Sequence, residues 1–148
     1  MTGSTNRRLA NSVVAGLAAV VGALAGWPTW TLSGSATRNS YASLRAAQAV
    51  GIDQLTPFRV VWFLVPVAAA AMVLLLVAKA TRSAGVVGLL AAVVLVGFGG
   101  VVLRTPVASG VGPWMALGAG VVLAGASFGL LSPGLLFQRL LSQGERKA

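Results

Sequence analysis

The chain contains no cysteine and no histidine, and its only acidic side chains are Asp53 and Glu145. The absence of cysteine excludes disulfides and thiolate metal sites, and the absence of histidine removes the most common general base and metal ligand. General acid–base catalysis needs titratable side chains held close together. The two carboxylates are expected on opposite sides of a membrane. The sequence therefore predicts no catalytic residues, no cofactor or metal site, and no enzymatic activity.

Charge is also scarce, since 9% of the 148 residues are charged and 57% are hydrophobic. Soluble domains carry about 25% charged residues because they need a solvated surface. The net charge of +9 comes from eleven Lys and Arg that are scattered singly or in pairs. Between apolar segments, such residues are topology signals and contacts for anionic lipid headgroups. The composition thus favours membrane lipids over nucleic acid as a partner.

Four apolar runs are long enough to cross a membrane, which takes about 20 helical residues. They cover residues 9–28, 58–78, 84–103 and 113–131. In lipid each backbone N–H needs a partner within its own segment, so helices are expected. The predicted fold class is all-α: an integral membrane four-helix bundle that forms one transmembrane domain over residues 1–148.

Basic residues set the predicted orientation. With both termini inside, seven basic residues fall on the cytoplasmic side and four on the outer side, which favours an N-in/C-in arrangement. The inner set is Arg7, Arg8, Lys79, Arg82, Arg139, Arg146 and Lys147, and the outer set is Arg38, Arg45, Arg59 and Arg104. The four tryptophans, expected at the membrane interface, all fall on the outer side: Trp27, Trp30, Trp62 and Trp114.

The first run has a second interpretation. Arg7-Arg8, an apolar stretch and Ala23-Leu24-Ala25 are typical of a cleavable signal peptide. Against cleavage, Gly26-Trp27 continues the apolar run and Pro28 follows directly. We expect this helix to remain attached.

Small residues recur at four-residue spacing in three of the runs, and such stripes let helix backbones approach closely. They serve either packing within the bundle or docking of another subunit, and the sequence leaves both open. The stripes read Ala18, Gly22, Gly26; then Ala84, Gly88, Ala92; then Gly112, Ala116, Gly120, Ala124. The predicted packing or partner interface comprises Gly22, Gly26, Gly88, Ala92, Ala116 and Gly120.

Two connections have structure of their own in this interpretation. Residues 31–57 form a long outer loop, in which Tyr41, Leu44, Ala47 and Val50 predict a short helix that ends at Gly51. After Ser132-Pro133, apolar residues lie opposite polar ones at helical spacing, which predicts a short amphipathic C-terminal helix on the cytoplasmic surface. An extension of the fourth helix is the alternative.

The motifs Trp27-Pro28-Thr29-Trp30 and Gly112-Pro113-Trp114 resemble those of small actinobacterial membrane proteins, typified by the tryptophan-operon-associated membrane protein family. The long first loop followed by three closely linked spans is similar to a claudin-like layout. The richness in Ala, Val, Gly and Arg is typical of a genome with high GC content. The resemblance implies a multi-pass protein of the bacterial plasma membrane, and it assigns no catalytic residues.

The sequence-based hypothesis for function is a non-enzymatic accessory, assembly or regulatory subunit of a larger inner-membrane complex. A mycobacterial MCE-type lipid transport complex ranks first among such complexes. The alternatives are an accessory subunit of a respiratory supercomplex, a stand-alone small transporter or lipid-binding membrane protein, and an envelope structural or sensing protein. Other membrane subunits and lipids are the expected partners.

The N-in/C-in orientation predicts how single cysteines will react, because the chain has none of its own. In intact cells, an impermeant maleimide should label Ser35→Cys and leave Ser142→Cys unlabelled until the membrane is permeabilised. Labelling of Ser142→Cys in intact cells would reverse or abolish the predicted orientation.

Overall fold

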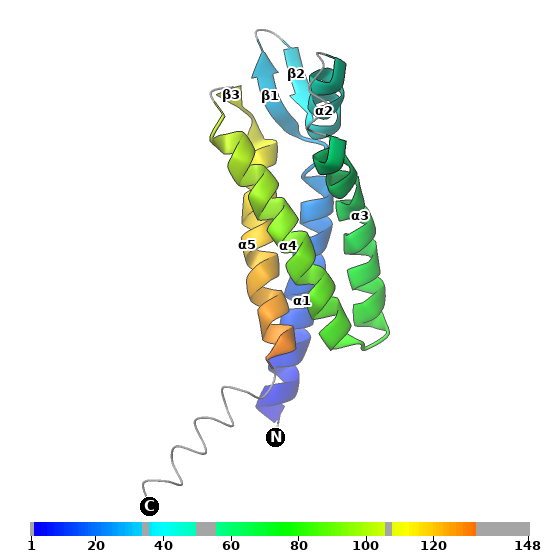
Figure 1. The fold of residues 1–148 in the computed structure, drawn as a ribbon. Coiled ribbons are helices and arrows are strands. Elements are labelled where there is room, and N and C mark those ends of the chain that lie inside the picture. Colours follow the sequence, from blue (N-terminus) through cyan, green and yellow to red (C-terminus); the bar gives the residue numbers. More distant parts are fainter. Residues whose placement is uncertain (1, 34–35, 50–55, 106–107, 133–148) are drawn as a thin grey trace, which may run out of the picture.

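The computed structural model describes residues 2–33, 36–49, 56–105 and 108–132. Four long helices pack side by side, and a short helix with a small sheet lies at one end of them (Figure 1). The long helices are α1 (Thr2–Leu24), α3 (Thr56–Val77), α4 (Thr81–Leu103) and α5 (Val111–Leu131), and the short one is α2 (Ser40–Ala49). The strands are β1 (Thr29–Ser33), β2 (Ala36–Asn39) and β3 (Ala108–Ser109).

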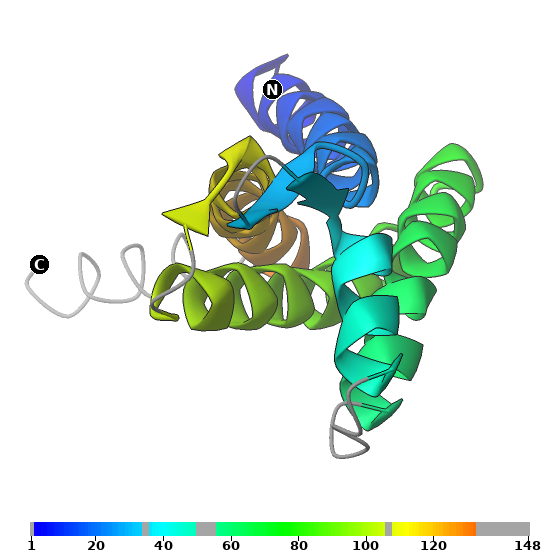
Figure 2. The ribbon, with the colours of Figure 1, turned by 90° about the horizontal axis from the view of Figure 1, so that it is seen from above.

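The long helices contact one another in the order α1–α5–α4–α3, and α3 closes the ring against α1. The contact between α4 and α5 is the most extensive (Figure 2 looks down the bundle). Each long helix has 21 to 23 residues. At 1.5 Å per residue they are about 32–35 Å long, which matches a hydrocarbon core of about 30 Å.

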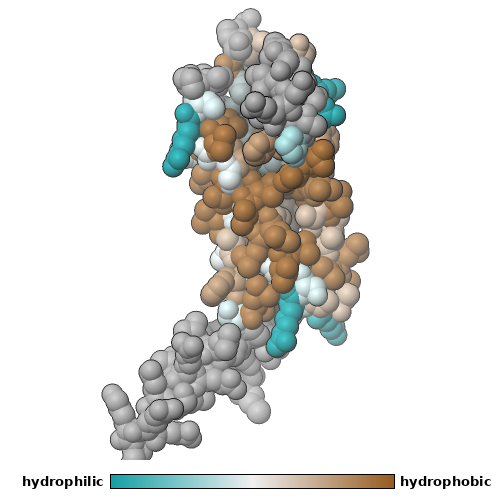
Figure 3. Space-filling view, in the orientation of Figure 1, coloured by the Kyte–Doolittle hydropathy of each residue, from teal (hydrophilic) through white to brown (hydrophobic). Residues whose placement is uncertain are grey.

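On the face shown in Figure 3, an apolar band covers the middle of the molecule, with hydrophilic side chains toward its ends. All four long helices carry exposed large apolar side chains. Within the described residues, three helical segments are long and apolar enough to cross a membrane: Pro57–Val77, Thr81–Leu103 and Val111–Leu131. In α1 only Leu9–Leu24 is apolar, which is shorter than those three. Three helices thus have the length and composition of the predicted membrane spans, whereas these two properties do not establish α1 as a fourth span.

Small residues fill the interior of the bundle. A Cβ atom on Gly22 of α1 would lie 2.6 Å from Leu95 Cδ1 of α4, and one on Gly120 of α5 would lie 2.8 Å from Val96 Cγ2. The six residues predicted as a packing or partner interface all lie buried: Gly22, Gly26, Gly88, Ala92, Ala116 and Gly120. These six residues therefore make close contacts within the chain.

Gly88 of α4 faces Ser127 of α5. A Cβ on Gly88 would collide with Ser127 Oγ, and Met72 of α3 lies on the other side of the same site. Ser127 is fully buried. Its hydroxyl lies within the apolar interior and has no hydrogen-bond partner among the described residues. The small serine therefore acts here as a packing residue.

A three-stranded antiparallel sheet corrects the all-α prediction. Its strand order is β2–β1–β3, with Thr31 paired to Arg38 on one side and to Ser109 on the other. The segment 29–33 was predicted as the end of a span and the start of a loop. It is instead a strand, because the connection between α4 and α5 supplies a third strand that satisfies its second edge. The pairing of β1 with β3 joins segments far apart in sequence and leaves no local signal, whereas β1 and β2 are neighbours in the chain.

Helix boundaries also differ from the prediction. α1 begins at Thr2 and ends at Leu24, whereas residues 9–28 were expected. α2 confirms the short helix in the outer loop, and it begins where the Asn39 side-chain oxygen accepts a hydrogen bond from the N–H of Ala42 at 2.8 Å. The predicted stop at Gly51 and the amphipathic helix after Ser132 lie outside the described residues.

The packing of α4 against α5 predicts opposite effects for two neighbouring glycines. A Cβ on Gly99 would lie 2.8 Å from the carbonyl oxygen of Pro113, whereas one on Gly97 would have nothing within 4 Å. Gly97→Ala should leave stability unchanged or raise it by up to about 1 kcal/mol, through helix propensity. Gly99→Ala should lower it by about 1–3 kcal/mol, because backbone cannot yield as a side chain does.

The measurement is thermal unfolding in mild detergent followed by circular dichroism. Equal shifts in Tm for both variants would contradict this helix contact.

Candidate functional site

The sheet and α2 form a cap on one end of the bundle, here called the sheet cap (residues 29–33, 36–49 and 108–109) (Figure 1). The sheet cap draws on both connections at that end, since β1, β2 and α2 follow α1 while β3 precedes α5. It places exposed side chains at this end of the bundle, beyond the apolar band.

Trp30 anchors the sheet cap in the bundle. The pairing of β1 with β2 shifts between Thr29↔Asn39 and Thr31↔Arg38, so Trp30 is the extra residue of a β-bulge. Bulges re-aim side chains. Trp30 is 1% exposed, and its indole Nε1 donates a hydrogen bond to the carbonyl oxygen of Ala25 at 2.6 Å. The strand is thereby tied to the end of α1.

Ser40 forms the second attachment of the sheet cap to the bundle. Its hydroxyl donates to the carbonyl oxygen of Gly26 at 2.8 Å and accepts the indole N–H of Trp62 at 2.9 Å. Its backbone N–H also donates to the Gly26 carbonyl, at 3.2 Å. The side chain is 1% exposed, so water does not reach its hydroxyl, and these two partners provide its hydrogen bonds instead. One small residue thus joins the chain after α1, the start of α2 and the first turns of α3.

Aromatic rings complete this attachment. Trp30 lies edge-on to Trp62 with ring centroids 4.9 Å apart, and Trp62 stacks on Phe98 of α4 at 4.6 Å. Such pairs contribute about 0.5–1.5 kcal/mol each beyond their area burial. Gly112 of α5 lies against the indole of Trp30 with no room for a Cβ. We call Trp30, Ser40, Trp62 and Phe98 the aromatic lock.

The outer side of the sheet cap is aromatic and basic. Trp27 is 58% exposed and lies edge-on to Tyr41 at 5.5 Å, and Tyr41 in turn lies 4.9 Å from Phe63. Burial raises the pKa of the Tyr41 hydroxyl above its usual value of 10.0. Three arginines are exposed at this end, Arg38, Arg45 and Arg104, and no acidic side chain occurs among the described residues.

The four tryptophans all lie at the sheet-cap end, but they divide into two roles. Trp27 and Trp114 are exposed, at 58% and 61%, as expected for rings at a membrane interface. Trp30 and Trp62 are 1% exposed and lie inside, although the sequence places them at the interface too. Their indole N–H groups are satisfied by Ala25 and Ser40 rather than by water.

Sequence reasoning missed two members of the aromatic lock. Asn39 and Ser40 stand at the start of a helix and form a recognisable capping signal. Nothing in that signal indicates the hydrogen bond between Ser40 and the distant indole of Trp62. Phe98 lies within an apolar run, where nothing distinguishes it from a lipid-facing ring. Neither residue could be paired with its partner without the tertiary structure.

The described side chains of this site offer hydrogen bonds, ring contacts and positive charge. Within the described part of the chain, no group of three or more His, Cys, Asp or Glu residues is placed to hold a metal ion.

No family model, curated protein or solved structure matches the chain. The resemblance to the tryptophan-operon-associated membrane proteins stays a prediction. A functional assignment therefore starts from the geometry of the sheet cap and the apolar band.

The aromatic lock predicts a strong coupling between Ser40 and Trp62. Ser40→Ala leaves the buried indole N–H of Trp62 without an acceptor, which should cost about 1–3 kcal/mol of stability. In a Trp62→Phe background the same change should cost measurably less, because the donor is already gone. The exposed Ser83→Ala on α4 serves as the matched control. Additive effects of Ser40→Ala and Trp62→Phe on thermal unfolding would contradict the hydrogen bond.

Tyr41 is the only tyrosine, so its ionisation can be followed directly by ultraviolet absorbance of the tyrosinate. The folded protein should titrate above pH 10.0, and a peptide of residues 36–49 should titrate near the usual value. The folded state holds the proton of the Tyr41 hydroxyl more tightly than the unfolded state does. The stability that follows from this difference is present below pH 10 and is lost as the pH rises through the folded pKa of Tyr41. Trp27→Ala, which uncovers the ring, should move the midpoint back toward 10.0. A midpoint at or below that of the peptide would contradict the burial.

Proposed function

We propose that the chain is a multi-pass protein of the bacterial plasma membrane with four spans and both termini in the cytoplasm. Three helices qualify by length and composition. In support of α1 as the fourth span, it packs against both α3 and α5, and it exposes large apolar side chains such as Leu17 and Leu24. Those side chains need lipid around them. The start of α1 and the turn with Lys79 and Arg82 lie at the end opposite the sheet cap, which we assign to the cytoplasm.

We further propose a non-enzymatic accessory or assembly subunit of a larger inner-membrane complex, which recognises its partner through the sheet cap. The observation that carries this proposal is the aromatic lock. A connection that only joins two helices needs no buried serine and no stacked indoles beneath it. Binding surfaces, in contrast, gain affinity when their backbone is held in one conformation before the partner arrives.

The chemistry of the sheet cap indicates the kind of partner. Beside the sheet cap, Trp27 and Trp114 supply large exposed aromatic surface. Within it, Arg38 and Arg45 supply positive charge without any acidic neighbour among the described residues. Aromatic residues and arginine are the side chains enriched at binding hot spots. We therefore propose a partner with an acidic surface outside the membrane. A mycobacterial MCE-type lipid transport complex is the first to test, and a respiratory supercomplex is the second.

Charge reversal at the sheet cap tests this function. Arg38→Glu and Arg45→Glu should reduce the recovery of the partner at least about fivefold, since each reversal of a paired charge costs on the order of 1 kcal/mol or more. Arg82→Glu, equally exposed at the opposite end, is the matched control and should leave recovery unchanged.

The measurement is quantitative mass spectrometry of native complexes purified in mild detergent, after confirming equal expression and Tm for the three variants. Equal recovery of every co-purifying membrane subunit with all three variants would reject partner recognition by the sheet cap.

A further inference from the structure

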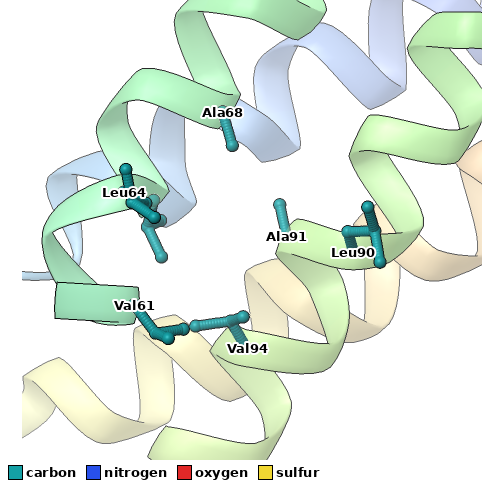
Figure 4. A pocket seen from close by; sticks show the side chains of 7 residues that line it. Val61, Leu64, Ala68, Leu90, Ala91 and Val94 are labelled. Carbon is teal, nitrogen blue, oxygen red and sulfur yellow. The ribbon is translucent and has the colours of Figure 1, made fainter. Parts of the chain in front are cut away.

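An apolar groove runs between α3 and α4 on the side of the bundle (Figure 4). Its volume is about 160 Å³, and its walls are Val61, Leu64, Val65, Ala68, Leu90, Ala91 and Val94. Ala68 and Ala91 point toward one another across the gap, and so do Val61 and Val94 (Figure 4). The two alanines leave open the space that larger side chains would fill between the helices. The groove opens outward within the apolar band, so an occupant reaches it from the surrounding lipid and not from water.

The depth of the groove limits what can enter it. Val61 lies five residues and Ala68 twelve residues after Thr56, the first residue of α3 at the sheet-cap end. At 1.5 Å per residue this places the groove about 8–18 Å along the helix, while half of a hydrocarbon core is about 15 Å thick. The groove therefore spans the depth at which the lipid tails of one leaflet lie, and headgroups do not reach it.

The lining selects the chemistry of the occupant. All seven side chains are hydrocarbon, so a water molecule would find none of the partners that it requires. A helix with its side chains is about 10–12 Å across and does not fit into a slot between two helices that are in contact with each other. A single alkyl chain is the shape that matches.

Charge at the sheet-cap end favours one headgroup class. Arg38, Arg45 and Arg104 are exposed at the sheet-cap end, and acidic side chains are absent from the described residues. Each basic residue near a membrane surface favours an anionic lipid by about 1 kcal/mol. From these observations we infer that the α3–α4 groove is a lipid site: it holds one acyl chain of an anionic phospholipid whose headgroup lies among the arginines of the sheet cap. This site goes beyond the proposed subunit role and does not depend on it.

The test is native mass spectrometry of protein released from nanodiscs that contain equal amounts of phosphatidylglycerol and phosphatidylcholine with identical acyl chains. The wild type should retain one phosphatidylglycerol, in about fivefold excess over phosphatidylcholine. Two variants fill the groove from opposite helices, Ala68→Leu and Val94→Phe, and both should lose the retained lipid. Ala70→Leu, exposed on α3 and outside the groove, is the matched control and should keep it.

The outcomes separate the parts of the proposal. Retention of lipid by both groove-filling variants at the wild-type level, or no retained lipid in the wild type, would overturn the site. So would an equal loss in Ala70→Leu. Equal retention of the two lipids by the wild type would overturn the choice of an anionic headgroup. The tryptophan emission of the aromatic lock shows whether each variant is folded, and the two fillings act independently, so failure of one to fold leaves the other to decide.

Discussion

The hydroxyl of Ser40 joins three parts of the chain. It donates to the carbonyl of Gly26 just after α1 and accepts the indole N–H of Trp62 in α3, while its own backbone begins α2. Removing water from two polar groups and a hydroxyl is favourable only when each finds a partner. The position of β1, the burial of Trp30 and the exposed face of the sheet cap all depend on this arrangement.

Within the apolar band, close packing takes the place of hydrogen bonding. Lipid tails are as apolar as the side chains, so helices associate where their backbones approach closely. The buried glycines of α4 and α5 provide that approach, with Gly88 against Ser127 and Gly99 against the backbone of Pro113. The larger side chains, such as Leu90 and Phe128, point outward to lipid. Small residues thus line the closest contacts between the helices, and larger buried side chains such as Met72, Leu95 and Leu123 fill the interior around them.

These two regions suit two kinds of recognition. The sheet cap offers aromatic rings and arginines on a backbone fixed by the aromatic lock, which suits a protein partner outside the membrane. The α3–α4 groove offers only hydrocarbon at the depth of lipid tails, which suits an acyl chain. The arginines of the sheet cap serve both surfaces, because positive charge favours an acidic protein and an anionic headgroup alike.

The sequence by itself determined the membrane character, the approximate position of the apolar helices and the short helix α2. Those features follow from composition and from local periodicity, which can be read from the residues of a single segment. The small-residue stripes could be read from spacing, but only the tertiary structure showed that Gly22 and Gly120 are covered by Leu95 and Val96 of the same chain. The sheet, the bulge at Trp30 and the pairing of Ser40 with Trp62 were likewise decided by the fold. The third strand and the Ser40–Trp62 hydrogen bond join residues that are distant in sequence, and the free energy of such contacts depends on geometry that no single segment contains.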